Sequence, residues 1–215
     1  MVLCVDTTTE FTGIAIADKN KSVYLKLETS HASDKILETI DHLIQKADIK
    51  LSDLKGVFAI KGPGSFTGLR VGIAVANQFA HQLKIPIIGL QTEEWYQYRT
   101  DESDFIYLQS MNRDQVYMVG FGKFSRDYPQ SIIPISECHY ELASKLDVKW
   151  FGQASDEHRQ QLSDIKEITD CRPADATWLK TIQNTTIESQ KIYDLIEPFY
   201  GKEPTITKSK RKLSI

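Results

Sequence analysis

The chain has 215 residues, of which 41% are hydrophobic and 26% charged, and its formal net charge at neutral pH is −3. This composition is ordinary for a globular protein, and the length allows a sizeable core in one large domain or two compact halves. The small negative charge argues against a surface that is basic throughout, so any contact with nucleic acid would be local or supplied by a partner.

The cysteines and the apolar runs indicate the compartment. Cys4, Cys138 and Cys171 are far apart and form no Cys-x-x-Cys pair, which fits a reducing environment. No apolar stretch is long enough to span a bilayer, and the N-terminus enters a strand pattern without the features of a secretory signal. We therefore expect a cytoplasmic protein that makes no membrane contact.

The first ninety or so residues alternate between short aliphatic runs and two longer segments with apolar residues at helical spacing. Ser33 is the expected N-cap of the first helix, whose apolar stripe is Ile36, Leu37, Ile40, Leu43, Ile44 and Ala47. The second helix is expected over Phe66–Leu83. The predicted strands are Val2–Asp6, Thr12–Asp18, Ser22–Glu28, Val57–Ile60 and Ile85–Leu90. The order strand-strand-strand-helix-strand-helix-strand, which opens with an antiparallel meander, is that of the ribonuclease-H-like unit of actin and sugar kinases.

A polar run, Thr100–Asp104, marks the predicted boundary between an N-terminal subdomain, residues 1–103, and a smaller C-terminal subdomain, residues 104–215. A hairpin that turns at Asn112-Arg113 is expected after it. Beyond Ser131 the pattern weakens, and it predicts strands at Ile132–Ile135 and Val148–Phe151 and helices at His139–Leu146, Asp156–Leu162 and Ala174–Ile187. The second half is therefore expected to be a reduced, degenerate version of the first.

The most informative stretch is Gly62-Pro63-Gly64-Ser65-Phe66-Thr67-Gly68-Leu69-Arg70, which follows a strand and opens a helix. Free N–H groups and the helix dipole favour an anion at such a place, so a phosphate loop is one interpretation. The spacing is against it, because a Rossmann fingerprint needs glycine at Thr67 and a Walker loop needs lysine at Leu69. A nucleophile elbow around Ser65 would need glycines at Pro63 and Thr67. We therefore favour a structural turn and helix cap.

The helix behind this loop is apolar on nearly every side, which indicates burial on more than one side. One apolar face consists of Leu69, Ile73, Ala76, Ala80 and Leu83, and a second consists of Val71, Val75 and Phe79. Two interpretations stay open. The helix can be buried within the chain, between the sheet and the first helix, or part of its surface can contact a second protein chain.

The glycine loop and four further segments carry a family resemblance: Val5-Asp6-Thr7-Thr8-Thr9-Glu10, Ile85-Pro86-Ile87-Ile88-Gly89, Glu197-Pro198-Phe199-Tyr200 and, more loosely, Asn112–Tyr117. Together they resemble the TsaB (YeaZ) family. The resemblance implies an α/β, actin-like ATPase (ASKHA, ribonuclease-H-like) fold with two subdomains, the second reduced. It also implies a non-catalytic subunit of the machinery that makes threonylcarbamoyladenosine next to the tRNA anticodon.

The same resemblance implies partners and a binding surface. The partners are a TsaD-like transferase and a TsaE-like ATPase, with a homodimer for the chain alone and with tRNA reached only through the complex. TsaB-like proteins bind TsaD through their two N-terminal helices. The candidate anchors, in or under the interface, are therefore Ile36, Ile40, Leu43, Leu69, Val75 and Phe79.

The residues of an autonomous enzyme are missing from the pattern. TsaD-like enzymes hold a metal with His-x-x-x-His, where this chain has Thr92 and Tyr96, and none of its five histidines lies four residues from another. We expect no metal ion and place the histidines at the surface or in caps. Asp6 stands where the fold keeps a phosphate-loop carboxylate, but the sequence contains no Asp-x-Gly and no Gly-Gly. Asp6 is therefore expected to be vestigial, capping neighbouring threonine N–H groups, with no bound cofactor.

Three alternatives stay open. The chain can be an autonomous ATP-dependent kinase or hydrolase of the actin-like superfamily. A Cys–His nucleophile pair at Cys138-His139 is not favoured, since adjacency in sequence does not bring thiol and imidazole face to face. The basic cluster Lys208–Lys212 is either a solvated end or a salt-dependent contact with tRNA phosphates.

Overall fold

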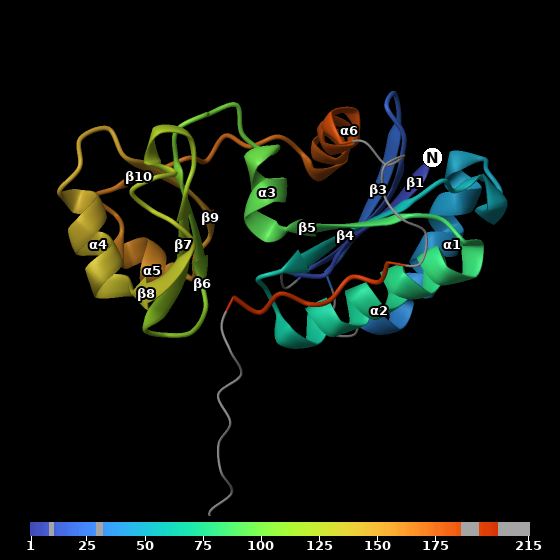
Figure 1. The fold of residues 1–215 in the computed structure, drawn as a ribbon, viewed down its shortest axis with the longest axis horizontal. Helices are drawn as coiled ribbons and strands as arrows, with labels where there is room; N and C mark the ends of the chain where they lie inside the picture. The colour runs from blue at the N-terminus through green and yellow to red at the C-terminus, as the bar shows by residue number, and fades with distance from the viewer. Residues whose placement is uncertain (9–10, 29–31, 186–193, 202–215) are drawn as a thin grey trace, which may run out of the picture.

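Two five-stranded mixed sheets, each covered by helices, make up the protein (Figure 1). The computed structural model describes residues 1–8, 11–28, 32–185 and 194–201. The basic cluster Lys208–Lys212 and the last residues of the helix predicted to reach Ile187 lie outside this part of the chain. None of the helices in the described ranges has the length and apolarity that a bilayer crossing requires.

The first sheet has the strand order β3-β2-β1-β4-β5. Its strands are β1 (Val2–Asp6), β2 (Thr12–Ala17), β3 (Ser22–Leu27), β4 (Val57–Gly62) and β5 (Ile87–Gln91). The first three strands form the predicted antiparallel meander, and β4 and β5 add to it in parallel. The order of strands and helices predicted for this half is confirmed.

Side chains of β1 alternate between two apolar clusters, as the period of a strand requires. Val2 and Cys4 face one cluster, and Leu3 and Val5 face the other. Both faces of the sheet are buried, which explains why β1 is continuously apolar.

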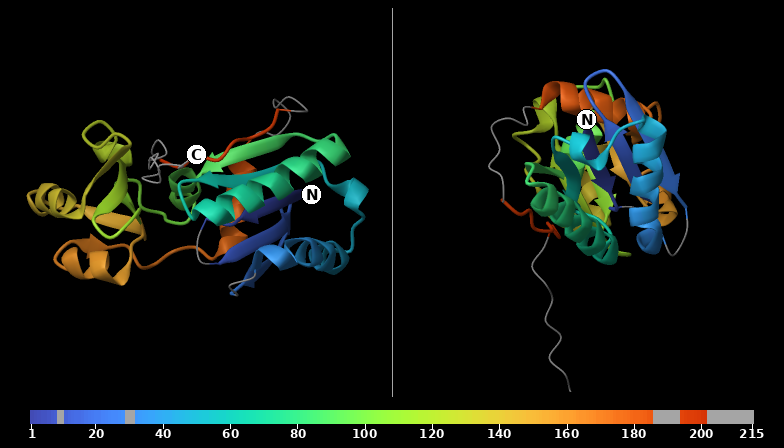
Figure 2. Two further views of the ribbon diagram at one scale, coloured as in Figure 1. Left: turned by 90° about the horizontal axis from the view of Figure 1, so that it is seen from below. Right: turned by 90° about the vertical axis from the view of Figure 1, so that its right-hand side faces the viewer.

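The helices α1 (Ile36–Ala47) and α2 (Phe66–Leu83) cover one face of the first sheet, and α3 (Thr92–Gln97) and α6 (Ala174–Asn184) cover the other (Figures 1 and 2). The helix α2 has the predicted bounds. Ser33 is not the N-cap of α1, because a 3-10 turn, η1 (Ala32–Lys35), comes first and places Lys35 in the capping position. A second 3-10 turn, η2 (Leu51–Asp53), leads into β4.

The second sheet repeats the topology of the first, with the order β10-β9-β6-β7-β8. Its elements are β6 (Ile106–Ser110), β7 (Gln115–Gly120), η3 (Gly122–Phe124), β8 (Ser131–Pro134), α4 (Ile135–Ala143), β9 (Lys149–Gln153), α5 (Asp156–Gln161) and β10 (Lys166–Glu167). The central strand β6 pairs antiparallel with β7 and parallel with β9, as β1 does with β2 and β4. Several strands and helices of the second half are thus shorter than their counterparts in the first half, but all five strands are present in the same order.

The predicted second subdomain, residues 104–215, needs one correction. The helix α6 packs on β3 and β2 of the first sheet, and residues 194–201 also return to that sheet. The reason is burial, since Trp178 and Ile182 of α6 join the same apolar cluster as Val2 and Cys4. The chain therefore leaves the first lobe after α3 and comes back to it with α6.

An aromatic cluster joins the two lobes. Tyr96 of α3 lies 5.2 Å from Tyr107 of β6 and 5.1 Å from Phe151 of β9, measured between ring centroids. Side chains on the opposite face of the second sheet form a separate core with α4 and with Leu162 and Ile165, which follow α5. The face of the second sheet that looks toward the first lobe is therefore part of a shared core.

Candidate functional site

The glycines of α2 face the turn that follows β1. A Cβ on Gly68 would lie 2.1 Å from the carbonyl oxygen of Thr7. A Cβ on Gly72 would lie 2.1 Å from Oγ1 of the same threonine. At Gly64 the closest atom would be the carbonyl oxygen of Thr8, at 2.6 Å. These glycines therefore let the helix approach the β1–β2 turn more closely than any side chain would allow.

Ser65 completes this contact. Its backbone N–H donates to the carbonyl oxygen of Thr8 at 2.8 Å, and its Oγ accepts from the backbone N–H of Gly68 at 3.3 Å. This is an N-cap, which satisfies one of the free donors at the start of α2. These contacts fit a structural turn and helix cap.

A C-terminal strap, residues 194–201, runs across α2 and the adjoining strands. The side-chain amide of Asn77 donates to the carbonyl oxygen of Ile196 at 2.9 Å and accepts from its N–H at 3.0 Å. The N–H of Phe199 donates to the carbonyl oxygen of Lys61 at 2.6 Å. Gly62, at φ +115°, has no room for a Cβ, because the carbonyl oxygen of Phe199 would lie 2.0 Å away. The loop and the strap thus fit each other.

Four of the six candidate anchors, predicted to lie in or under the interface, lie below the surface. Ile36, Ile40, Leu43 and Leu69 are at most 1% exposed, and the three residues of α1 pack against the first sheet. They can support a binding surface only from below. Val75 and Phe79 are partly exposed and remain available.

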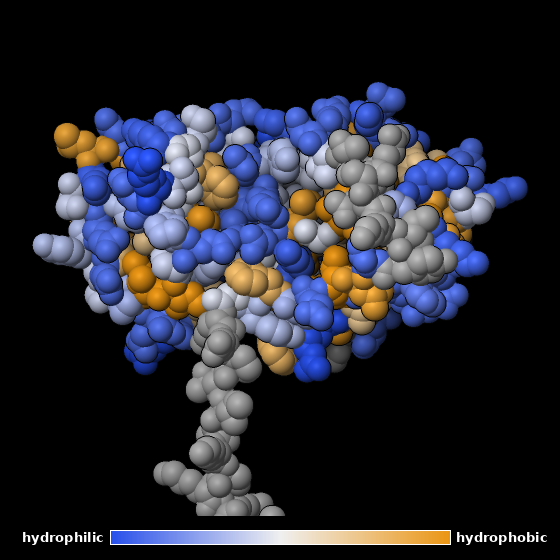
Figure 3. Space-filling view, viewed as in Figure 1, coloured by the Kyte–Doolittle hydropathy of each residue, from blue (hydrophilic) through white to orange (hydrophobic). Residues whose placement is uncertain are grey.

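The helices α1 and α2 carry further accessible apolar side chains. We define the apolar ridge as Val71, Val75, Phe79 and Leu83, which are partly exposed and follow one another at intervals of four along α2. Leu37 of α1 and Phe66 at the start of α2 are 63% and 58% exposed. The ring of Phe66 stacks on Tyr200 at 5.0 Å and lies 5.3 Å from the guanidinium of Arg70. In Figure 3 apolar surface is visible where the strap crosses α2.

The carboxylate of Asp6 accepts hydrogen bonds from the turn that follows it in the chain. It is 8% exposed, and its Oδ1 accepts from the N–H of Thr8 at 3.0 Å and from the Thr8 hydroxyl at 2.6 Å. Burial raises the pKa of Asp6, while the Thr8 hydrogen bonds and the charge of Arg99 act in the opposite direction. The predicted capping of a threonine N–H is observed.

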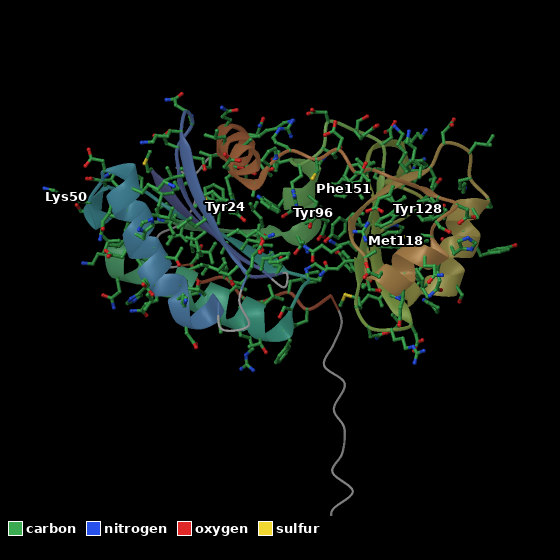
Figure 4. All side chains as sticks on the ribbon, turned by 180° about the vertical axis from the view of Figure 1, so that it is seen from behind. Tyr24, Lys50, Tyr96, Met118, Tyr128 and Phe151 are labelled. Atoms are coloured by element: carbon green, nitrogen blue, oxygen red, sulfur yellow. The ribbon has the colours of Figure 1, made fainter. Side chains whose placement is uncertain are left out.

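A cavity of about 670 Å³ lies between the lobes. Its wall includes Asp6, Tyr24 and Lys26 from the first sheet, Trp95, Tyr96 and Arg99 from α3 and the segment after it, and Ser110, Gln153 and Arg159 from the second lobe. Figure 4 shows Tyr96 and Phe151 in the region between the two sheets and Tyr24 on the first sheet. Arg99, Gln153 and Arg159 carried no signal in the sequence, because the fold brings them together from distant segments.

The residues that correspond to the metal site of TsaD-like enzymes have structural contacts here. The hydroxyl of Thr92 donates to the carbonyl oxygen of Pro63 at 2.6 Å, and Tyr96 belongs to the aromatic cluster. Among the described residues no group of three or more His, Cys, Asp or Glu side chains is placed to hold a metal ion. His31 lies outside those residues.

His158 is fully buried, which corrects the expectation that the histidines lie at the surface or in caps. Its Nε2 lies 2.9 Å from the carbonyl oxygen of Arg113, and its Nδ1 lies 2.7 Å from Oγ of Ser110. Because a carbonyl can only accept, Nε2 carries a proton, and in the neutral imidazole Nδ1 accepts from the serine. Ser110 Oγ also accepts from the N–H of Ser155 at 2.8 Å, so the serine and histidine tie β6 to α5 beside the cavity.

Cys138 and His139 point to different partners. Cys138 is fully buried with its Sγ 3.9 Å from the sulfur of Met118, and burial raises the pKa of its thiol to about 12. His139 Nε2 lies 2.9 Å from Asp164. A buried thiol with so high a pKa is a poor nucleophile.

Comparisons with known proteins identify the family. The family model described as "TsaD: tRNA N6-adenosine threonylcarbamoyltransferase" matches residues 26–184. A curated protein of Buchnera aphidicola subsp. Schizaphis graminum, named tRNA threonylcarbamoyladenosine biosynthesis protein TsaB, is 30% identical over 166 residues, which cover 70% of this chain and 76% of that protein. The protein of the same name from Bacillus subtilis is 24% identical over 174 residues, which cover 76% of each chain.

Solved structures agree on the fold. A Pseudomonas aeruginosa structure described as an uncharacterized protein with similarity to peptidase YEAZ superimposes with a TM-score of 0.71 at 16% identity, covering 94% of this chain and 99% of that one. The two sheets are the ribonuclease-H-like units of an α/β, actin-like fold. With a family model that spans most of its length and a relative at 30% identity, the chain belongs to the TsaB (YeaZ) family, within the wider group of TsaD-like proteins.

Proposed function

We propose that the chain is a non-catalytic subunit that binds and supports a TsaD-like transferase in the threonylcarbamoylation of the adenosine next to the tRNA anticodon. Its family relatives are named for the biosynthesis of threonylcarbamoyladenosine in tRNA. The observation that carries the proposal is the accessible apolar surface of α1 and α2, which consists of the apolar ridge and the largely exposed side chains of Leu37 and Phe66.

This surface has the features of a binding site. Large apolar side chains that are exposed together favour association with another protein, and aromatic and aliphatic anchors supply most of the energy of such contacts. Buried residues of both helices, among them Ile40, Leu43 and Ala76, pack α1 and α2 against the sheet. A rigid surface loses little conformational entropy on binding.

The interior supports the non-catalytic part of the proposal. Oδ1 of Asp6 already accepts two hydrogen bonds from Thr8. The Thr7-Thr8 turn packs against the start of α2 and accepts a hydrogen bond from the N–H of Ser65. A phosphate bound in that loop would have to displace both contacts.

The test is complex formation with the cognate TsaD-like subunit. Val75→Glu and Leu37→Glu place a charge on the proposed surface, and each should weaken the complex at least about tenfold in a calorimetric titration. Leu146→Glu is the matched control, because Leu146 is 91% exposed in the second lobe, away from α1 and α2. If the wild-type proteins, both folded, form no complex, the proposal is wrong.

Two further partners belong to the same proposal. In isolation the α1–α2 surface pairs with a second copy of the chain, and in the full assembly a TsaE-like ATPase joins while tRNA is reached through the complex. Light scattering should give a dimer mass for the wild type and a monomer mass for Val75→Glu. A wild-type monomer at high concentration would remove the homodimer.

The alternative is an autonomous ATP-dependent kinase or hydrolase, for which the inter-lobe cavity with Asp6 in its wall is the supporting feature. It requires that the isolated chain turns over ATP and that Asp6→Asn abolishes the turnover. We expect phosphate release from ATP at the background rate in both proteins.

A further inference from the structure

Three planar side chains lie together at the surface where α2 begins and the C-terminal strap ends (Figure 1). The ring of Phe66 stacks on the ring of Tyr200 with an interplanar angle of 29°, and the guanidinium of Arg70 lies over the same phenylalanine ring. We call these three residues the stacked patch. Phe66 is 58% exposed and Arg70 is exposed as well, so aromatic rings and a positive charge meet solvent at one place.

The charge of Arg70 is not neutralised by a neighbour. No carboxylate of the described residues forms an ion pair with it, and the contact of its guanidinium is with the ring of Phe66. A guanidinium that stacks on a ring keeps the donors at its edge available, and their arrangement matches the oxygens of a phosphate. The stacked patch therefore offers a phosphate-binding group beside two aromatic rings.

The stacked patch and the apolar ridge lie on different sides of α2. Successive residues of an α-helix are turned by about 100° around its axis, so Arg70 points away from Val71, the first residue of the ridge. Asn77, two turns beyond Arg70, binds the strap on the same side of the helix. Arg70 and Tyr200 are thus outside the surface proposed above for the transferase, and only Phe66 belongs to both.

A strongly basic segment follows the stacked patch directly in the chain. The structure describes the strap up to Gly201, and residues 202–215 continue from it. This segment contains one acidic residue, Glu203, and five basic residues. The basic residues are Lys202, Lys208, Lys210, Arg211 and Lys212. Because the formal net charge of the whole chain is −3, this concentration of positive charge is local.

The strap fixes the point from which the basic segment extends. Its backbone is held by the side chain of Asn77 and by the carbonyl oxygen of Lys61. A polypeptide spans at most about 3.6 Å per residue, so the Cα atom of Lys208 stays within about 25 Å of that of Gly201. The basic cluster Lys208–Lys212 is therefore tethered close to the stacked patch.

Positive charge next to exposed aromatic rings is the combination with which proteins bind unpaired nucleic acid. Bases stack on the rings, and arginine and lysine side chains neutralise the phosphates. An anionic membrane would match the charges but offers no planar group for the rings. RNA thus fits both features, and the family relatives are named for a process that takes place on tRNA.

We propose that the stacked patch and the basic segment that follows it form a contact surface for an unpaired stretch of RNA, with bases stacked on the rings and phosphates bound by Arg70 and by Lys208–Lys212. The choice of tRNA as this RNA rests on the proposed function, whereas the contact itself requires no transferase. It adds a direct contact to the one that tRNA makes through the complex.

The experiment is a titration of a fluorescein-labelled tRNA transcript with the full chain alone, followed by fluorescence anisotropy at about 50 to 200 mM salt. The affinity of the wild type should fall steeply as the salt concentration rises. A variant with glutamine at Lys208, Lys210, Arg211 and Lys212 should bind at least about tenfold more weakly at the lowest salt. Its plot of log affinity against log salt should be shallower by about 3, since each phosphate contact contributes about 0.7 to 0.9.

Two variants test the stacked patch. Tyr200→Leu removes a ring without a change of charge, so it should weaken binding about fivefold or more and leave the salt dependence unchanged. Arg70→Gln should weaken binding several-fold and make the plot shallower by about 1. Arg126→Gln is the matched control, because Arg126 is an exposed arginine of the second lobe, and it should bind tRNA as the wild type does.

Three outcomes overturn the proposal. One is that the wild type does not bind tRNA at the lowest salt. Another is that the glutamine variant of the basic cluster binds weakly while Tyr200→Leu and Arg70→Gln bind normally, which would mean that the basic segment attracts any polyanion. The third is that phosphatidylserine vesicles compete with tRNA and bind more tightly, which would make a membrane the partner. Failure to bind the transferase, with the RNA results as expected, would contradict the proposed function alone.

Discussion

Glu93 is a buried carboxyl that links the two lobes. It is 2% exposed, and its Oε1 accepts from the hydroxyl of Tyr117 at 2.6 Å and from Nε2 of Gln130 at 2.7 Å. Its Oε2 is buried without a partner among the described residues. Burial raises the pKa of Glu93, and the hydrogen bonds from Tyr117 and Gln130 offset only part of this. The residue is thus more readily neutral than an exposed glutamate.

This raised pKa predicts a pH-dependent stability. The folded state holds the proton of Glu93 more tightly than the unfolded state does, so the free energy of unfolding should fall as the pH rises from about 4.3, the usual glutamate value, through the folded pKa. Glu93→Gln should reduce this fall in urea denaturation between pH 5 and pH 8. Part should persist, because burial also raises the pKa of Asp6. Glu38→Gln, on the exposed side of α1, is the control, and an unchanged slope in Glu93→Gln would contradict the prediction.

Gly68 tests the close contact between α2 and the β1–β2 turn. In an exposed helix a change from glycine to alanine stabilises by about 1 kcal/mol. Here the new Cβ would lie 2.1 Å from the carbonyl oxygen of Thr7, so Gly68→Ala should instead destabilise by about 1 to 3 kcal/mol, as overpacking does. Thermal unfolding measures this, with Thr67→Ala, at an exposed neighbouring position, as the control. A stabilised Gly68→Ala protein would show that the helix can move away from Thr7 at little cost.

The C-terminal strap is an element without regular secondary structure, and its position depends on a few defined contacts. One residue of α2, Asn77, provides two hydrogen bonds to the backbone of Ile196. Asn77→Ala removes both hydrogen bonds and should lower the free energy of unfolding by about 1 to 3 kcal/mol. It should also speed hydrogen exchange at the amides of Ile196 and Phe199. Gln78→Ala, one residue further and exposed, should leave these rates unchanged, and equal rates in the two variants would mean that the strap is held by its other contacts.

Elements with strong local signals could be predicted from the sequence, and the short or non-local ones could not. The helix α2 was predicted at its true bounds because a glycine-proline turn begins it and a proline follows it. The helix α3 has six residues and β10 has two, which is too little chain to show a period. The helix α6 was recognised as a helix, but nothing in its sequence indicated that it packs on β2 and β3.

Within the candidate site, too, local features could be predicted from the sequence and contacts between distant residues could not. The glycine loop was visible because glycine and proline mark turns wherever they stand. The hydrogen bond between Ser110 and His158 joins residues 48 positions apart, and the arginines of the cavity come from separate lobes. Such pairs follow from the tertiary fold, so a single sequence contains no spacing that would reveal them.

At the scale of the whole molecule, the duplicated topology has not produced two independent domains. Each sheet has its own helix-covered core on one face. The faces that look toward each other share one aromatic cluster, to which α6 also contributes. A chain that ended near residue 103 would lose α6 and expose Trp95 and Tyr96, so the first lobe should be unstable alone.

This shared core predicts that the lobes unfold together. Unfolding in urea should give one transition that coincides in tryptophan fluorescence and in far-ultraviolet circular dichroism. Phe151 belongs to β9 but packs on Tyr96 of the first lobe, so Phe151→Ala should shift both signals together by about 3 to 5 kcal/mol. Tyr140→Ala, at a side chain that is 78% exposed, should change stability by no more than about 0.5 kcal/mol. Two separate transitions, or a Phe151→Ala effect confined to one of them, would show that each lobe is stabilised by its own core and that the aromatic cluster only positions the two against each other.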